Sequence, residues 1–142
     1  MSAAHHLDTN VILRFLLADD PKQSPKARAP FALAQTGKVT LCISNVCLAE
    51  VTWVLVSLYA FERGKLATIL RELVLHDGVE VENEAALLDA LDRFGRVDFV
   101  DCYAAALAKH AGWPVVTENR VIKKFTDIVS RRPAEVLRRF IP

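Results

Sequence analysis

Cysteine is scarce in this sequence, and the few cysteines follow no ligand or redox motif. The three residues, Cys42, Cys47 and Cys102, form no C-x-x-C pair and lie in apolar stretches. Their odd number and their apolar surroundings are typical of buried free thiols rather than of a disulfide framework. We therefore expect a reducing compartment, the cytoplasm.

Long hydrophobic runs and a strong net charge are also missing. No uninterrupted stretch of about 18 apolar residues occurs, and no basic segment followed by a long apolar run opens the chain. We expect neither secretion nor a membrane partner. The net charge of +1 gives no global electrostatic signal for a nucleic-acid or a protein partner.

The composition is that of an ordinary folded domain. The chain has 142 residues, of which 52% are hydrophobic and 25% charged, enough to bury a sizeable core. We expect one soluble domain over residues 1–142. Positive charge gathers locally near the end of the chain, where seven basic residues stand against three acidic ones between Glu118 and Pro142.

The order of apolar patterns predicts an α/β fold. Short strands are expected at 5–8, 39–43, 79–81 and 113–117, of which the first, second and fourth are expected to be buried. Helical patterns occur at 11–18, 21–35, 45–59, 62–75, 83–94 and 98–111. Pro30 is expected to kink or divide the second of these helices. Strands separated by helices favour right-handed crossovers, and hence a three-layer fold with a central parallel sheet of four to five strands and helices on both faces.

Four carboxylates lie inside or next to strongly apolar segments. Asp8 follows the first strand, Glu50 lies about two turns into its helix, and Asp98 and Asp101 open another helix. An ionised carboxylate is costly in such surroundings unless a cation or a donor compensates it. Mg²⁺ or Mn²⁺ prefers oxygen ligands, so the pattern indicates a metal site suited to phosphodiester hydrolysis.

Each acid also has a purely structural interpretation. Asp8 and Asp98 stand where an N-cap is favoured, and Asp98 with Asp101 resembles a variant capping box. Glu50 is harder to explain in this way. Its helix is apolar nearly all round, so we expect its side chain to be enclosed.

Four stretches together resemble the PIN-domain ribonucleases, and most closely the VapC-type toxins of toxin-antitoxin pairs. The stretches are LDTNVILRFLLADDP (7–21), SNVCLAEVTWVL (44–55), VDFVDCYAAALAKHAG (97–112) and PVVTENRVIKKF (114–125). The resemblance covers nearly the whole chain. It implies a PIN-like fold and a Mg²⁺- or Mn²⁺-dependent endoribonuclease that cuts RNA, forms a homodimer and is inhibited by a VapB-type antitoxin.

The resemblance also assigns the acids. It places the catalytic acids at Asp8, Glu50 and Asp101, with Asp8 and Asp101 as metal ligands and Asp98 as an accessory acid. The family's fourth acid corresponds to Asn119. An asparagine lacks the negative charge, and Glu118 points the other way in an extended segment, so we expect a single metal ion.

Neighbouring residues complete the expected site. Thr9 or Asn10 is expected to position a ligand or a phosphate oxygen, and Arg120, Lys123 and Lys124 to contact the RNA backbone. Two alternatives remain: a PIN-like binding module that no longer cleaves, and a phosphoacceptor signalling domain. The second alternative normally needs a lysine in the strand at 113–117, which has none.

Overall fold

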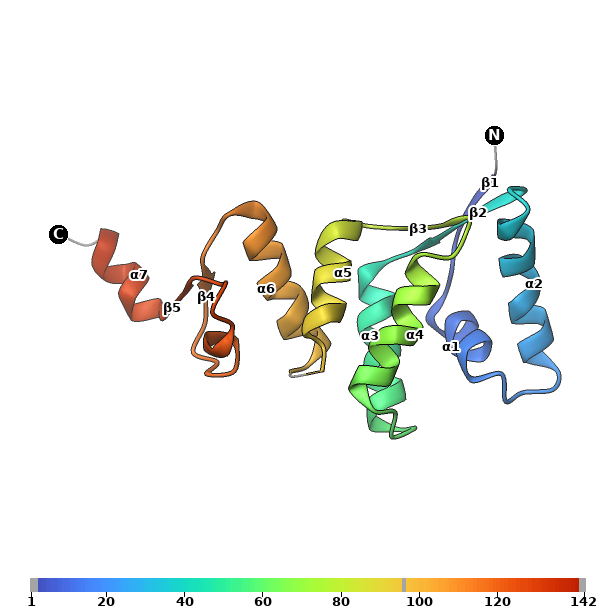
Figure 1. The fold of residues 1–142 in the computed structure, drawn as a ribbon, viewed down its shortest axis with the longest axis horizontal. Helices are drawn as coiled ribbons and strands as arrows, with labels where there is room; N and C mark the ends of the chain where they lie inside the picture. The colour runs from blue at the N-terminus through green and yellow to red at the C-terminus, as the bar shows by residue number, and fades with distance from the viewer. Residues whose placement is uncertain (1–2, 96, 141–142) are drawn as a thin grey trace. The chain divides into compact units, whose positions relative to one another are not determined.

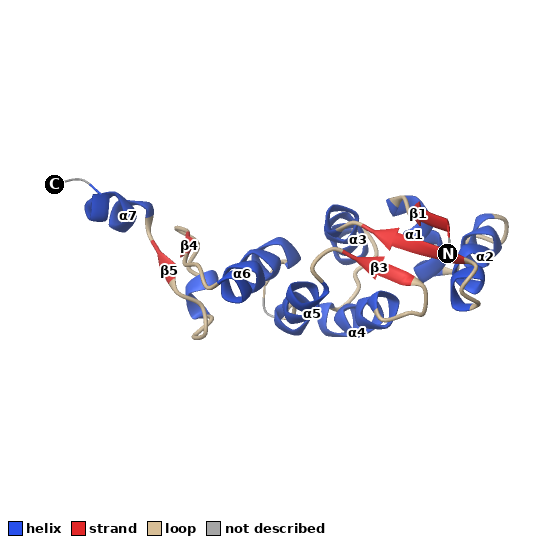
Figure 2. Cartoon of the chain, turned by 90° about the horizontal axis from the view of Figure 1, so that it is seen from above, coloured by secondary structure: helices blue, strands red, loops and turns tan. Residues whose placement is uncertain are grey.

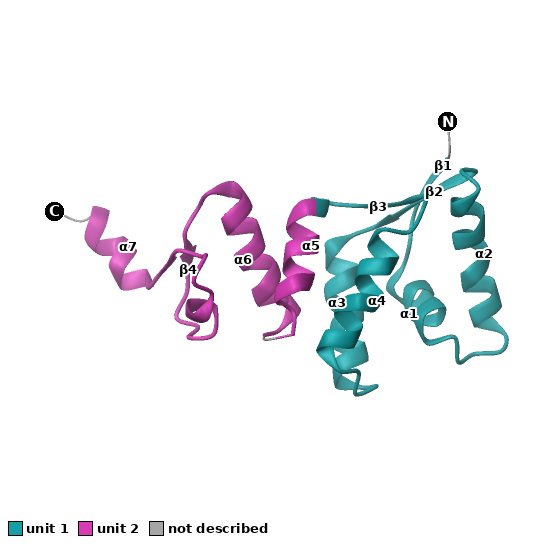
Figure 3. Cartoon of the chain, in the orientation of Figure 1, with its two compact units in different colours: residues 1–84 teal, residues 85–142 magenta. Residues whose placement is uncertain are grey.

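The computed structural model describes residues 3–95 and 97–140 (Figure 1). The chain divides into two compact units, unit 1 running to Glu84 and unit 2 starting at Ala85 (Figure 3). The mixture of helices with parallel strands is that of an α/β protein, as the sequence predicts. No helix of the described ranges is long and apolar enough to cross a membrane.

Unit 1 contains three strands and four helices. They are β1 (Ala3–His6), α1 (Thr9–Leu17), α2 (Gln23–Gln35), β2 (Val39–Ile43), α3 (Asn45–Ser57), α4 (Arg63–Val74) and β3 (Val79–Val81). The predicted strands at 39–43 and 79–81 have the bounds expected from their β-branched residues. The sequence predicts that the helix containing Pro30 is kinked or divided. It is not divided, because α2 continues as one helix through this proline.

The strands of unit 1 form a parallel sheet in the order β1-β2-β3 (Figure 2). The register sets His6 opposite Cys42, and Cys42 opposite Glu80. The expected burial of the first strand is wrong, because all four residues of β1 are exposed. The strand lies at the edge of a three-stranded sheet, and the buried strand residues are Leu41 and Ile43 of the central β2.

Unit 2 continues the chain through helices and a second small sheet. Its elements are α5 (Glu84–Arg93), α6 (Phe99–Ala111), β4 (Val115–Val116), the 3-10 helix η1 (Ile122–Lys124), β5 (Ser130–Arg131) and α7 (Pro133–Phe140). The sequence predicts four to five strands in one sheet. Instead, β4 pairs in parallel with β5, through hydrogen bonds from Val115 N to Val129 O and from Thr117 N to Arg131 O, both 2.8 Å.

Local signals explain where the key helices begin and end. Ser44 caps α3, since its hydroxyl oxygen accepts a hydrogen bond from the backbone N–H of Cys47 at 3.1 Å. Gly112 ends α6 in the left-handed conformation, with φ of 73°, and its N–H donates to the carbonyl of Lys109. These two residues set the start of the helix bearing Glu50 and the end of the helix bearing Asp101.

Each unit has its own apolar core. In unit 1, Phe31 of α2 is buried and stacks on Phe15 of α1 with ring centroids 3.9 Å apart. In unit 2, the buried rings of Phe94 and Phe99 meet edge to face at 6.0 Å. The buried face of α6 beside Phe99 consists of the small residues Cys102, Ala105, Ala106 and Ala108, and Asp101 in the first turn is half-buried.

Candidate active site and family membership

Asp8 stands at the junction between β1 and α1. Its backbone has the extended conformation of an N-cap, and its carbonyl accepts hydrogen bonds from the N–H groups of Val11 and Ile12. Its carboxylate accepts none from the first turn of the helix and is exposed. The capping is therefore done by the backbone, and the carboxylate remains available to a ligand.

The two residues after Asp8 differ in accessibility. Thr9 is buried, with 6% of its surface exposed, whereas Asn10 is exposed. A buried threonine in the first turn of α1 supports the local packing. Asn10 is the better placed of the two to contact a phosphate oxygen.

Glu50 is exposed on α3, and the expectation that it is enclosed is wrong. The buried side of the helix consists of Leu48, Val51 and Leu55, and Glu50 shares the opposite side with Trp53, which is 62% exposed. Apolar residues lie all around α3, so hydrophobicity did not identify the side that packs. Glu50 is thus a solvated carboxylate within unit 1.

Asp98 and Asp101 open α6 in unit 2. Asp98 is exposed and occupies the N-cap position with extended backbone, but its side chain makes no capping hydrogen bond to the helix. Asp101 is half-buried in the first turn. A carboxylate in the first turn is favoured by the partial positive charge of the helix N-terminus.

Asn119 lies beside Asp101 and is oriented by two hydrogen bonds. Its Oδ1 accepts from the N–H of Val121 at 2.9 Å, and its Nδ2 donates to Oδ2 of Asp101 at 3.3 Å. The backbone donor of Val121 fixes which side of the amide faces Asp101. Asn119 therefore presents a donor, not an acceptor, to the carboxylate.

The segment leading to Asn119 is also held locally. Thr117 accepts a hydrogen bond at its Oγ1 from the N–H of Asn119 at 2.8 Å. Glu118 is exposed, as are Arg120, Lys123 and Lys124, which follow along the chain and into η1. The three cations are thus accessible to a polyanion near Asn119.

The donor set of unit 2 suits a hard divalent cation. Oδ2 of Asp101 accepts from Asn119, whereas Oδ1 has no hydrogen-bond partner among residues 3–95 and 97–140. Mg²⁺ usually binds one or two carboxylates and keeps several waters. No group of three or more His, Cys, Asp or Glu side chains able to hold a metal ion occurs in the described parts of the chain.

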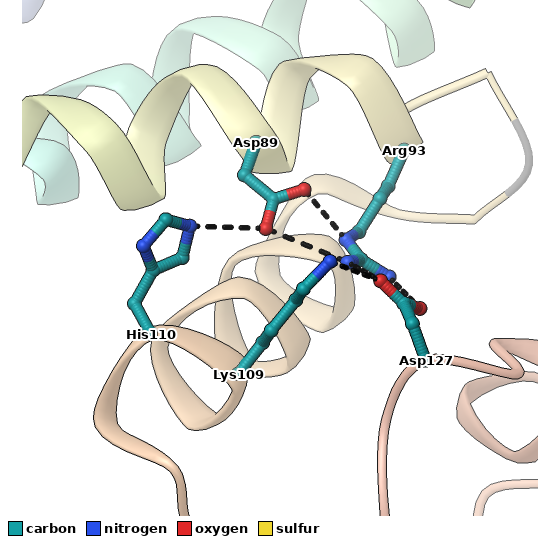
Figure 4. Close-up of polar contacts among 5 residues, drawn as sticks. All are labelled: Asp89, Arg93, Lys109, His110 and Asp127. Carbon is teal, nitrogen blue, oxygen red and sulfur yellow. Dashed lines mark hydrogen bonds and ion pairs between the residues drawn. The ribbon is translucent and has the colours of Figure 1, made fainter.

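A network of charged side chains, which sequence reasoning missed, crosses unit 2 (Figure 4). Arg93 of α5 is 8% exposed and donates hydrogen bonds to Asp89 on the same helix and, through both terminal nitrogens, to Asp127. Lys109 of α6 binds Asp127 at 2.8 Å, and His110 lies 3.2 Å from Asp89. The sequence offers only the four-residue spacing of Asp89 and Arg93 as a signal.

This network ties the segment after Asn119 to two helices. The hydrogen bonds from Arg93, and then those from Lys109, hold the pKa of Asp127 well below its usual range, and Asp127 in turn raises the pKa of Arg93. The guanidinium of Arg93 also lies 4.9 Å from the ring centroid of Phe125. Residues 125–127 are therefore anchored to α5 and α6.

A family comparison identifies the kind of domain to which these residues belong. The family model described as PIN domain matches residues 6–128, which include Asp8, Glu50, Asp101 and Asn119. The chain belongs to the PIN-domain family. PIN domains are generally nuclease modules, and typically use divalent metal ions. A comparison with curated proteins gave no match.

The structure brings together some of the site residues that the sequence predicts. Within unit 2, the structure brings Asp101 and Asn119 together. Asp8 and Glu50 belong to unit 1. Their convergence with Asp101 on one metal ion, as the PIN pattern implies, remains a prediction.

Proposed function

We propose that this PIN domain is a metal-dependent endoribonuclease. The observation that carries the proposal is the pairing of Asp101 with Asn119, in which one carboxylate oxygen is held and the other is left for a ligand. Asp8 supplies a second solvent-exposed carboxylate directly after a strand. These two acids form the expected ligand set of a single Mg²⁺ or Mn²⁺ ion.

The ion, when bound, supplies a water of lowered pKa and stabilises charge on the phosphoryl oxygens. The protein residues then have separate roles. Asp8 and Asp101 hold the cation, Glu50 accepts a hydrogen bond from the attacking water, and Asn119 keeps the carboxylate of Asp101 in one orientation. Asn10 binds a phosphate oxygen of the RNA.

The exposed basic residues supply affinity for the substrate. Arg120, Lys123 and Lys124 lie within five residues after Asn119 and bind backbone phosphates of the RNA. Contacts of this kind release counterions, so affinity for RNA falls steeply as salt rises. Glu118 and Asp98 are additional exposed acids, next to Asn119 in the sequence and at the start of α6.

We further propose the role of a VapC-type toxin acting in the cytoplasm as a homodimer under a VapB-type antitoxin. The support is the order and spacing of the four sequence stretches that resemble such toxins. Expression of the wild-type chain should arrest bacterial growth, and expression of Asp101→Asn should not. Equal growth in both cases would contradict the toxin role.

A second function is favoured by one observation. Asn119 replaces an acid of the PIN pattern and already donates to Asp101, an arrangement that satisfies one oxygen of the carboxylate without a metal ion. A PIN-like module that binds RNA without cutting it would have such a site. Measurements of metal binding and of RNA cleavage distinguish the nuclease from this binding module.

The deciding experiment measures cleavage by the purified full chain. Single-stranded RNA should be cut in Mg²⁺ or Mn²⁺ and remain intact after chelation, while duplex RNA and single-stranded DNA of the same sequence are cut more slowly. Cleavage that persists in excess chelator would contradict metal dependence. Metal-independent binding without cleavage would favour the binding module.

A further inference from the structure

A pocket of about 370 Å³ lies in unit 2 beyond the C-terminal end of α6. Trp113, Pro114 and Val129 give it an apolar wall, and its charged lining consists of Lys109, Arg131 and Asp127. Its size lies in the range of small-ligand pockets, which are mostly apolar with a few polar groups. None of these residues belongs to the proposed metal site.

Trp113 has an exposed side chain on a backbone that is held by a hydrogen bond. The sequence predicts it at the start of a buried strand, whereas 73% of its surface is accessible. Its backbone N–H donates to the carbonyl of Ala108 at 2.9 Å, directly after the left-handed turn at Gly112. A large ring on a fixed backbone loses little entropy when another flat ring stacks on it.

Arg131 carries a donor that the protein itself does not satisfy. Its Nε is shielded from solvent and has no hydrogen-bond partner in the described part of the chain. An unmade hydrogen bond of a shielded donor is unfavourable. Rotation of the side chain toward an anion in the pocket would satisfy this group, so the site favours a ligand with phosphate or carboxylate oxygens.

The charge around the pocket is positive on balance. The carboxylate of Asp127 is already bound by Arg93 and Lys109, and Asp89 is bound by Arg93. Arg131 adds a third cation, which makes no ion pair within residues 3–95 and 97–140. An aromatic platform beside excess positive charge is the combination that binds single-stranded nucleic acid.

We propose that this pocket binds one nucleotide of a single-stranded RNA, with the base against Trp113 and its phosphate at Arg131. The inference deepens the proposed function, on which it rests for the choice of RNA. Asp101 lies in the first turn of α6 and Trp113 just after its last turn, roughly 16 Å apart along the helix axis. A stacked strand covers that distance in about five nucleotides.

The test uses the two tryptophans of the chain and RNA of roughly 10 nucleotides in the presence of EDTA, so that binding is measured without cleavage. Trp53→Phe leaves Trp113 as the only tryptophan, and RNA should quench its fluorescence. Trp113→Phe leaves Trp53, which lies on the side of α3 that carries Glu50, so its fluorescence reports separately on RNA at the catalytic acids. Trp113→Leu should weaken binding roughly 5- to 150-fold.

A charge variant with a matched control tests the phosphate contact. Arg131→Gln should reduce the slope of log affinity against log salt by about 1. Arg139→Gln removes the same charge from an exposed position on α7 and should leave the slope nearly unchanged. Circular dichroism and thermal unfolding verify that each variant is folded.

Two results would overturn the inference. The first is RNA binding that leaves Trp113 fluorescence and the affinity of Trp113→Leu unchanged, even if cleavage in Mg²⁺ is normal. The second is a Trp113→Leu variant that binds RNA normally but loses self-association in sedimentation, which would make the pocket a contact between copies. Conversely, RNA binding that needs Trp113 without any cleavage in Mg²⁺ would support the pocket and contradict the nuclease proposal.

Discussion

The amide of Asn119 donates a hydrogen bond from Nδ2 to Oδ2 of Asp101 at 3.3 Å, while its Oδ1 accepts from the N–H of Val121. An aspartate at position 119 would still accept the hydrogen bond from the N–H of Val121, but it would have no N–H to donate to Asp101. It would face Asp101 with a negative charge instead of a donor. The asparagine thus stabilises the half-buried carboxylate when no cation is bound.

The first prediction concerns this pair. Without metal, Asn119→Asp should lower the free energy of unfolding by about 1–3 kcal/mol, because a half-buried acceptor loses its donor and gains a like charge. With Mn²⁺, the added charge should raise metal affinity, seen by calorimetry as a second binding step. Urea denaturation in EDTA measures the predicted loss in the free energy of unfolding.

A double variant provides the control for that prediction. Asp101→Asn combined with Asn119→Asp exchanges donor and acceptor, so stability in EDTA should recover while metal affinity stays low. Failure of the double variant to recover any stability lost by Asn119→Asp would show that the hydrogen bond is not the cause.

The second prediction concerns Arg93, which is buried and joined to Asp89, Asp127 and the ring of Phe125. Arg93→Ala should destabilise the protein by roughly 3 kcal/mol, because charged hydrogen bonds within a partly buried network are lost. Arg93→Lys should recover only part of the lost free energy of unfolding, since an ammonium cannot form the bidentate contact with Asp127. Arg139→Ala, a surface control, should stay within about 0.5 kcal/mol of wild type in denaturant unfolding.

The third prediction follows from the lowered pKa of Asp127, whose main cause is its hydrogen bonds to Arg93. A carboxyl whose pKa is lower in the folded than in the unfolded state stabilises the fold above the unfolded pKa, near 3.9, and less as pH falls below it. The stability difference between wild type and Asp127→Asn should therefore be constant near neutral pH and shrink below about pH 4. A difference that grows on acidification would have the wrong sign for this cause.

Features with local signals could be predicted from the sequence. The strands at 39–43 and 79–81 consist largely of β-branched and other apolar residues, and Ser44 stands where a helix cap is favoured, so composition and position sufficed. The order of elements from β1 to β4 was also correct. The helix bounds differ from the predicted ranges by up to two residues, where caps rather than periodicity decide.

Features that depend on distant contacts could not be predicted. β5 has two residues and shows no alternation, so its pairing with β4 left no sequence signal. Arg93 and Asp127 lie 34 residues apart, and only the folded chain brings them together. The family pattern indicated positions 101 and 119, but the direction of their hydrogen bond depends on the backbone donor of Val121.

The central claim is that Asp101 holds the divalent cation that enables RNA cleavage. The most direct measurement is the rate at which purified wild type, Asp101→Asn and Asp77→Asn cut single-stranded RNA in Mg²⁺; Asp77, exposed in unit 1, serves as a charge-matched control. Asp101→Asn should cut more than about 100-fold more slowly than wild type and lose the Mg²⁺-dependent rise in melting temperature, while Asp77→Asn behaves as wild type. Equal cleavage rates for a folded Asp101→Asn and for Asp77→Asn would contradict the account.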